Sequence, residues 1–189
     1  MTFVLAVMFA GSSGGSGWGM VPVPCATADD CPVKAPPAGF GSPLCSYRDD
    51  RGRPDLGCTP GATLVHQTTK RICRPGYGQG GDQINPQTEG LVYSDYNVLD
   101  ASTPGAYQID HLIPVQLGGS NAETNLWPQP RTNARGFGYP QKNHLERVLR
   151  RLVCEHRLSL RVAQHQLATD WISAARRYAD RDPTVGNTG

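Results

Sequence analysis

One short stretch of the chain combines three side chains that together could hydrolyse a phosphate ester. Asp110 directly precedes His111 at the end of an apolar run, and Asn125 follows the histidine by fourteen residues. A carboxylate, an imidazole and a carboxamide are therefore expected close together around one turn. Such groups can hold a divalent cation and remove a proton from a water molecule. The types and spacing of these residues predict a hydrolytic metal site.

A β-hairpin over about residues 106–113 and 124–128 is expected to carry these groups. Its connection contains Pro114 and the pair Gly118-Gly119, which favour a turn, and Asn121 is expected to serve that turn alone. Neighbouring residues on a regular strand point to opposite faces of the sheet. The aspartate and the histidine that follows it can therefore share one ligand only if the first strand ends or bulges beside them.

A helix over about residues 141–154 is expected next, because its apolar residues repeat at helical spacing. On a helical projection Asn143 points about 160° from the centre of the apolar stripe, and His144 about 100° from it on the other flank. Arg147 and Arg150 fall within roughly 20° of Asn143. Asn143 is the preferred helical ligand, with His144 as the alternative, and the arginines suit a phosphodiester. The plainer interpretation gives the arginines only ion pairs on the helix surface.

These features resemble the core motif of the HNH endonucleases, whose ββα-metal fold is a hairpin followed by a helix around one metal ion. The residues that carry the resemblance are Asp110-His111, Pro114, Gly118-Gly119, Asn125 and the following Leu126-Trp127-Pro128. The run is similar to that of a secreted bacterial branch of the family, in which a Lys-Asp-x-x-Glu helix follows. Here that helix segment reads Lys142-Asn143-His144-Leu145-Glu146. Residues 58–62 also resemble the amino-terminal segment of the branch, so the resemblance covers about residues 54–178.

The resemblance implies an α+β fold with a small ββα-metal core, an extra carboxy-terminal helix and an irregular amino-terminal segment rich in Cys, Pro and Gly. It implies an endonuclease that hydrolyses phosphodiester bonds of DNA, with RNA as a further substrate. His111 would be the general base. Asn125 would hold the turn by hydrogen bonds to the backbone, so that His111 stays aimed at its water molecule.

For the metal, the resemblance implies Asp110 together with Asn143 or His144 as ligands, and Mg²⁺ as the ion, with Mn²⁺ or Zn²⁺ as alternatives. Arg147 and Arg150 would bind the substrate phosphate. Asn143 stands where the branch has Asp, and a neutral amide oxygen binds a hard cation less well than a carboxylate does. This departure keeps a second function open, which is a catalytically inactive, disulfide-stapled extracellular binding module on the same scaffold.

The charge of the chain is unevenly distributed. The formal net charge is +2, but residues 1–128 hold 7 Lys/Arg against 11 Asp/Glu, and residues 129–189 hold 11 against 5. The carboxy-terminal third therefore carries +6 beside the motif. This asymmetry suits a polyanionic partner such as DNA, and an arginine-rich solvated helix is the plainer interpretation.

The six cysteines contain no Cys-x-x-Cys pair, which excludes the two-pair zinc knuckle of many HNH proteins. Disulfides are the favoured interpretation. Fifteen connectivities are open to six cysteines. Cys58–Cys73 is the expected pair, and Cys154 could instead be a buried free thiol.

Composition divides the chain into four segments: a signal-like leader and linker (1–24), an irregular Cys/Pro/Gly-rich segment (25–57), the nuclease-like domain (58–180) and a flexible tail (181–189). The apolar run at the start is too short to cross a membrane and lacks basic residues before it, as in a truncated signal peptide. We expect a secreted or periplasmic monomer without a membrane span in its mature form. Within the domain, residues 63–73 and 91–98 are expected to form short helices or extended runs. A second long helix is expected over about 160–179, with Ser159 as its N-cap.

Overall fold

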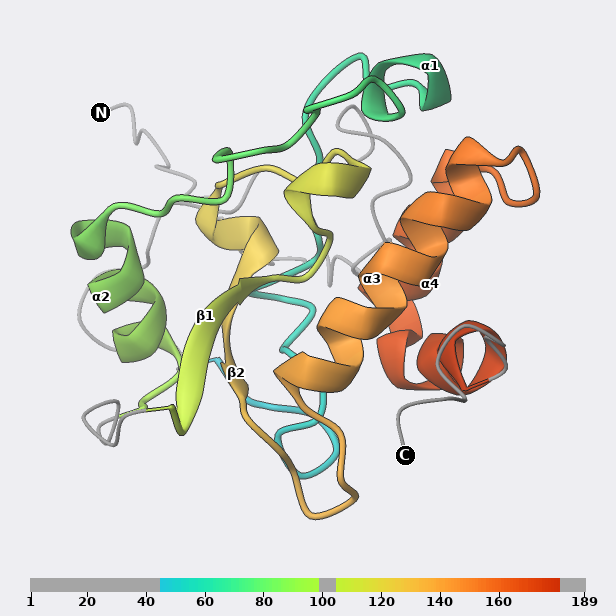
Figure 1. The fold of residues 1–189 in the computed structure, drawn as a ribbon. Helices are drawn as coiled ribbons and strands as arrows, with labels where there is room; N and C mark the ends of the chain where they lie inside the picture. Colours follow the sequence, from blue (N-terminus) through green and yellow to red (C-terminus); the bar gives the residue numbers. More distant parts are fainter. Residues whose placement is uncertain (1–44, 99–104, 181–189) are drawn as a thin grey trace, which may run out of the picture.

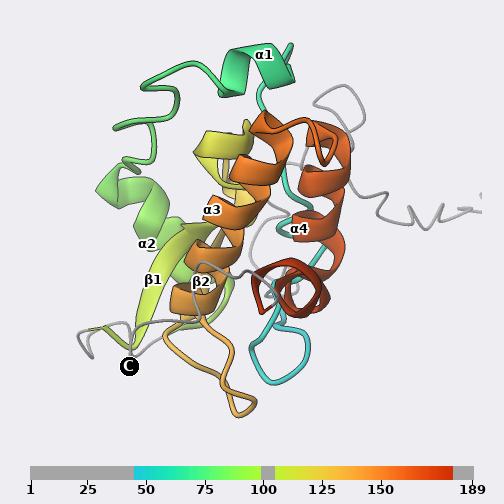
Figure 2. The same cartoon turned by 45° about the vertical axis from the view of Figure 1, so that its right-hand side comes forward.

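The computed structural model has an α+β fold and describes residues 45–98 and 105–180 (Figure 1). The expected leader, the residues before Cys45 and the expected tail lie outside the described residues. Along the chain the elements are α1 (Thr69–Ile72), α2 (Pro86–Asp95), β1 (Tyr107–His111), η2 (Val115–Leu117), η3 (Glu123–Asn125), β2 (Leu126–Pro130), α3 (Tyr139–Cys154), α4 (Leu160–Ala174) and η4 (Ala175–Ala179). In Figure 2, α3 lies between the hairpin and α4, and α2 lies on the other side of the hairpin.

The two strands form the expected hairpin. They pair antiparallel, with Asp110 opposite Trp127 and His111 opposite Leu126. The first strand ends at His111, two residues before the predicted end. The N–H of Leu112 then donates a hydrogen bond to Asn125 O at 2.7 Å. The strand therefore ends at the Asp110-His111 pair, which is the condition for both side chains to share one ligand.

The two glycines of the connection are required for different reasons. Gly118 has a φ of 87°, in the left-handed region that favours glycine. At Gly119 a Cβ atom would lie 1.7 Å from Ile113 O, so no side chain fits there. The backbone of the turn therefore packs directly against the residues that follow β1.

The two long helices occupy the expected positions and bury their apolar faces. Helix α3 begins at Tyr139, two residues before the predicted start. Pro140 therefore lies in the first turn of the helix, a position that tolerates proline. Ser159 caps α4 as predicted, because its hydroxyl accepts a hydrogen bond from Val162 N at 3.2 Å. The last part of the predicted second helix is a π-helix, η4, and Asp170 interrupts the helical backbone within α4. The buried apolar side chains of both helices join Trp127 of β2 in one core.

The segments before the hairpin contain two helices, and a buried hydrogen bond joins these segments to the hairpin. Helix α2 covers most of the predicted 91–98 segment but begins earlier, at Pro86, where the Asn85 side chain caps it. Only Thr69–Ile72 is helical within the predicted 63–73 segment. Thr59 is fully buried, and its hydroxyl donates to Leu126 O at 2.9 Å.

Two disulfides are present among the described residues, and neither is the expected pair. Cys45 is bonded to Cys58, and Cys73 to Cys154. The prediction of Cys58–Cys73 was therefore wrong, as was the alternative of a free thiol at Cys154. Because Cys73 follows α1 and Cys154 ends α3, the second bond joins these two helices. Within the described residues, no helix is both long and apolar enough to cross a membrane.

Candidate active site

A cleft of about 810 Å³ opens between the hairpin, the loop after β1 and the polar face of α3. The hairpin, the loop and the helix each contribute side chains that the sequence analysis singled out. It is lined by Asp82, Gln108, Ile109, Asp110, His111, Pro114, Val115, Gln116, Asn143, Glu146, Arg147, Arg150, Arg151 and Cys154. The strand end and the helix thus contribute to a single hollow, as the sequence predicted.

His111 lies at the wall of this cleft with 6% of its surface exposed. Its Nε2 atom is 2.8 Å from the Oδ1 atom of Asn121, whose Nδ2 donates to Gly81 O at 3.0 Å and to Gln83 O at 3.2 Å. These two carbonyl groups orient the amide so that its oxygen faces the imidazole. Asn121 therefore does more than serve the turn, which corrects the expectation from the sequence.

The protonation of His111 follows from these surroundings. Burial lowers the pKa of the imidazole, and the hydrogen bond to Asn121 and the charge of Asp110 oppose that effect only in part. The ring is therefore neutral near pH 7. Because the Asn121 oxygen accepts only, the neutral ring carries its hydrogen on Nε2, and Nδ1 is the basic nitrogen.

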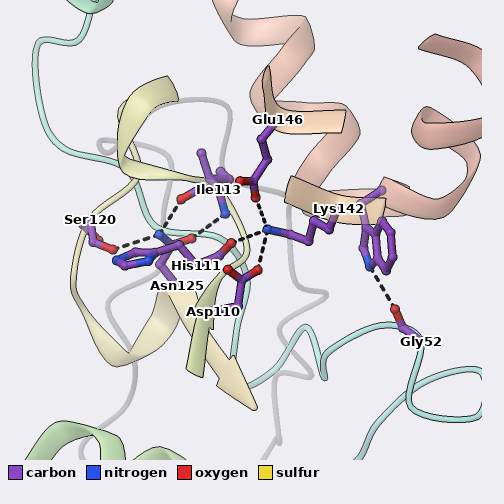
Figure 3. Close-up of polar contacts among 9 residues, drawn as sticks. Gly52, Asp110, His111, Ile113, Ser120, Asn125, Lys142 and Glu146 are labelled. Carbon is purple, nitrogen blue, oxygen red and sulfur yellow. Dashed lines mark hydrogen bonds and ion pairs between the residues drawn. The ribbon is translucent and has the colours of Figure 1, made fainter. Parts of the chain in front are cut away.

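Asn125 is fully buried and forms the backbone hydrogen bonds expected of it. Its Oδ1 accepts from Ile113 N at 2.9 Å, and its Nδ2 donates to Ile113 O at 2.9 Å and to Ser120 O at 2.8 Å (Figure 3). One side chain thus satisfies three backbone groups on both sides of the turn. The contact fixes the path of the chain directly after His111.

Lys142 is one of the residues of the site to which the sequence analysis gave no role. The residue is fully buried in the first turns of α3, and its ammonium lies between β1 and the helix (Figure 3). The Nζ atom donates to Asp110 Oδ2 at 2.7 Å, to His111 O at 2.5 Å and to Glu146 Oε1. Burial alone would lower the pKa of Lys142, but the two carboxylates outweigh it and raise the pKa.

Glu146 is the second acid of this network. Burial raises the pKa of its carboxyl group to about 7, although the adjacent Lys142 opposes the rise. Glu146 lines the same cleft as Asp110. The cleft therefore contains Glu146 as a second acid, and the charge of Glu146 changes near neutral pH.

The two candidate ligands of α3 point to different sides of the helix. Asn143 lines the cleft with Asp110 and His111. His144 lines a separate hollow of about 220 Å³ beside Phe137 and Ala175, and its Nε2 is buried without a hydrogen-bond partner among the described residues. The alternative with His144 as a ligand at this site is therefore wrong, because the helix turns its ring toward η4.

The two predicted phosphate-binding arginines also line the cleft. Arg147 is exposed. Arg150 is partly buried, and its Nη2 donates to Ile72 O at 3.2 Å, whereas its Nε has no hydrogen-bond partner within the described residues. The guanidinium of Arg150 is thus fixed at one side and retains an unused donor.

The donors of the cleft fit a hard cation better than a zinc ion. Asp110 uses one carboxylate oxygen, Oδ2, for Lys142, so Oδ1 is the oxygen that it would offer to a cation. Asn143 adds an amide oxygen from the facing helix, and oxygen donors are those that Mg²⁺ prefers. Across residues 45–98 and 105–180, no three His, Cys, Asp or Glu side chains gather as a metal-binding group. The site therefore suits an ion that keeps several of its waters.

Three residues of the site were missed by sequence reasoning: Lys142, Glu146 and Asn121. Lys142 and Glu146 stand four residues apart on the helix, as an ion pair would, and Lys142 flanks the apolar stripe. That spacing was a usable signal for a buried pair. Asn121 gave no signal of its own, because its contact with the imidazole depends on how the turn folds.

The chain was also compared with protein-family models, with curated proteins and with solved structures, and none of them matched it.

Proposed function

We propose that this protein is a metal-dependent endonuclease of the HNH class that hydrolyses phosphodiester bonds of DNA, and of RNA as a further substrate. The observation that carries the proposal is the cleft in which Asp110, His111 and Asn143 lie together beside two arginines. General base, oxygen donors for a cation and phosphate-binding groups are the parts that such hydrolysis needs.

His111 acts as the general base. Its Nδ1 takes a proton from a water molecule, and the resulting hydroxide attacks the phosphorus atom. The bond from phosphorus to the 3′-oxygen then breaks, and the departing oxygen takes a proton from solvent. A neutral imidazole is required at the start, which agrees with the lowered pKa of His111.

Asp110 and Asn143 would hold the divalent ion, Mg²⁺ first and Mn²⁺ as the alternative. When bound, such an ion offsets the negative charge that develops on the phosphate oxygens. Lys142 occupies one oxygen of Asp110, so this residue offers only its other oxygen to the ion. Asn125 keeps the chain after His111 in place by its three backbone hydrogen bonds.

Arg147 and Arg150 bind phosphate groups of the substrate. Their guanidinium groups line the cleft on the same helix as Asn143. Phosphate contacts carry no sequence information, so weak sequence preference is expected. The two disulfides fit a secreted or periplasmic protein, and we propose that it acts there as a monomer.

The proposal is tested with purified, oxidised protein and supercoiled plasmid DNA in Mg²⁺ or Mn²⁺. Nicking that is abolished by EDTA and by His111→Ala supports the endonuclease. The variant is checked by thermal unfolding, because His111 is nearly buried. Absence of nicking by the wild-type protein under every divalent metal would refute the activity.

A second candidate function is a catalytically inactive extracellular binding module. One observation favours it: the ammonium of Lys142 already neutralises Asp110, and the facing ligand Asn143 carries no charge. Both features weaken the attraction for a divalent ion. If the wild-type protein binds DNA as strongly in EDTA as in Mg²⁺ and nicks it in no metal, the result would support the module in place of the enzyme.

A further inference from the structure

The buried ammonium of Lys142 joins the two elements that form the cleft. Its side chain is fully buried, and a buried charge is costly unless it is paired and hydrogen-bonded. An ammonium group has three hydrogens. Lys142 has three acceptors, so each hydrogen has a partner.

Two of the three acceptors belong to consecutive residues at the end of β1. One is the side chain of Asp110, and the other is the main-chain carbonyl of His111. The strand ends at this residue, which pairs with Leu126 in the hairpin. Lys142 therefore holds the backbone at the point where the chain turns away from the sheet.

The same point is held from the opposite side by Asn125. Its backbone bonds fix Ile113, and Asn125 O accepts from Leu112 N at 2.7 Å. Residues 111–113 are thus held by Lys142 of α3 and by Asn125, the last residue of η3, directly before β2. The third bond of Lys142, to Glu146 on the next turn of α3, holds the ammonium itself in place.

We propose that Lys142 is a positioning residue, which fixes the carboxylate of Asp110 and the backbone of His111 so that both serve the same point in the cleft. The inference rests on the proposed endonuclease function for its catalytic part only. The ammonium is fully buried and does not touch substrate, so its effect on the reaction passes through Asp110 and His111.

The test uses Lys142→Met, which keeps the length of the side chain and removes its charge. Amide hydrogen exchange at Leu112 and Ile113 should accelerate at least about tenfold, while the amides of α4 keep their wild-type rates. In nicking assays kcat should fall about 100-fold while KM changes less than about threefold, because positioning acts on the chemical step and phosphate binding is retained. Lys70→Met, at an exposed lysine on α1, is the matched control and should change neither quantity.

Removal of one buried charge can also unfold the protein, so a second variant is needed. Lys142→Met/Glu146→Leu removes the lysine with one of its two carboxylates. It should fold, with fast exchange at Leu112 and Ile113 and with a kcat still near that of the single variant. A folded double variant with wild-type exchange and wild-type kcat would overturn the positioning role.

The two proposals can fail separately. If the wild-type protein nicks no DNA in any metal, the endonuclease function fails, and hydrogen exchange alone decides whether Lys142 holds the end of the strand. If the wild-type protein nicks DNA, a His111→Ala background supplies a further check. There Lys142→Met should lower the residual rate by clearly less than the roughly 100-fold expected in the wild-type background, because the part of its effect that passes through His111 is already lost.

Discussion

The Nε2 atom of His111 lies 2.8 Å from the Oδ1 atom of Asn121, and this contact sets which ring nitrogen is basic. The amide of Asn121 is itself oriented by the carbonyl groups of Gly81 and Gln83. The loop before α2 therefore orients Asn121, and through Asn121 it selects the tautomer of the histidine. Such a partner typically changes activity about 10–100-fold when it is removed.

The first prediction concerns the pH dependence of cleavage. Burial lowers the pKa of His111, so the acid limb of kcat/KM in saturating metal should have its midpoint below the ordinary histidine value of 6.5. The hydrogen bond that the ring donates to Asn121 raises this pKa, so Asn121→Ala should move the midpoint lower still while reducing the maximal rate about 10–100-fold. Rates of plasmid nicking between pH 5 and 8 measure both. A midpoint above 6.5 in the wild-type protein would contradict the assignment.

The second prediction concerns the pH dependence of stability. The pKa of Glu146 is about 7 in the folded protein, above its ordinary value of 4.5, so the folded state binds the proton more tightly. This contribution to stability is fully present below about 4.5 and is lost as pH rises toward 7. Between pH 4.5 and 7.5 the free energy of unfolding of the wild-type protein should therefore fall by about 1–3 kcal/mol relative to Glu146→Gln. Urea unfolding of both proteins measures the difference, and a constant difference would show that Glu146 is ionised throughout.

How much of this site the sequence could give depends on the kind of contact. The hairpin and the shared surface of Asn143 and Arg147 followed from strand and helix periodicity, because those are local geometry, whereas the end of β1 was predicted two residues after His111. Lys142 did not follow, because two of its three acceptors come from β1, distant in the chain. The disulfides did not follow either, because spacing alone does not distinguish among fifteen connectivities.

The third prediction concerns the affinity for the metal ion. Asn143→Asp replaces an amide oxygen of the cleft with a carboxylate, which a hard cation binds more strongly. The Mg²⁺ concentration that gives half-maximal nicking should fall about tenfold. Calorimetric titration with Mg²⁺ should show the same change without DNA. An unchanged affinity would mean that position 143 does not contact the ion.

The fourth prediction concerns the salt dependence of DNA binding. Arg147→Gln should weaken binding to DNAs of different sequence by a similar factor and reduce the slope of log K against log salt by about 1. Arg161→Gln, at an exposed arginine of α4 that does not line the cleft, is the charge-matched control. Equal slopes for the two variants would remove Arg147 from the phosphate-binding surface.

The fifth prediction compares the two disulfides. Cys73 and Cys154 are 81 residues apart, and Cys45 and Cys58 are 13 apart. In the chain-entropy description, loss of the longer loop costs about 4.5 kcal/mol and loss of the shorter about 3 kcal/mol. Paired Cys→Ala variants, compared by urea unfolding, should therefore rank in that order. The reverse order would mean that strain or residual structure outweighs loop entropy.

The role of His111 as general base is tested most directly by chemical rescue. His111→Gly removes an almost fully buried imidazole and leaves space for a free one. The variant should lose nicking in Mg²⁺, and added imidazole should restore it, with a rate that rises as the imidazole becomes neutral. His111→Gly that nicks at the wild-type rate without imidazole would contradict the account.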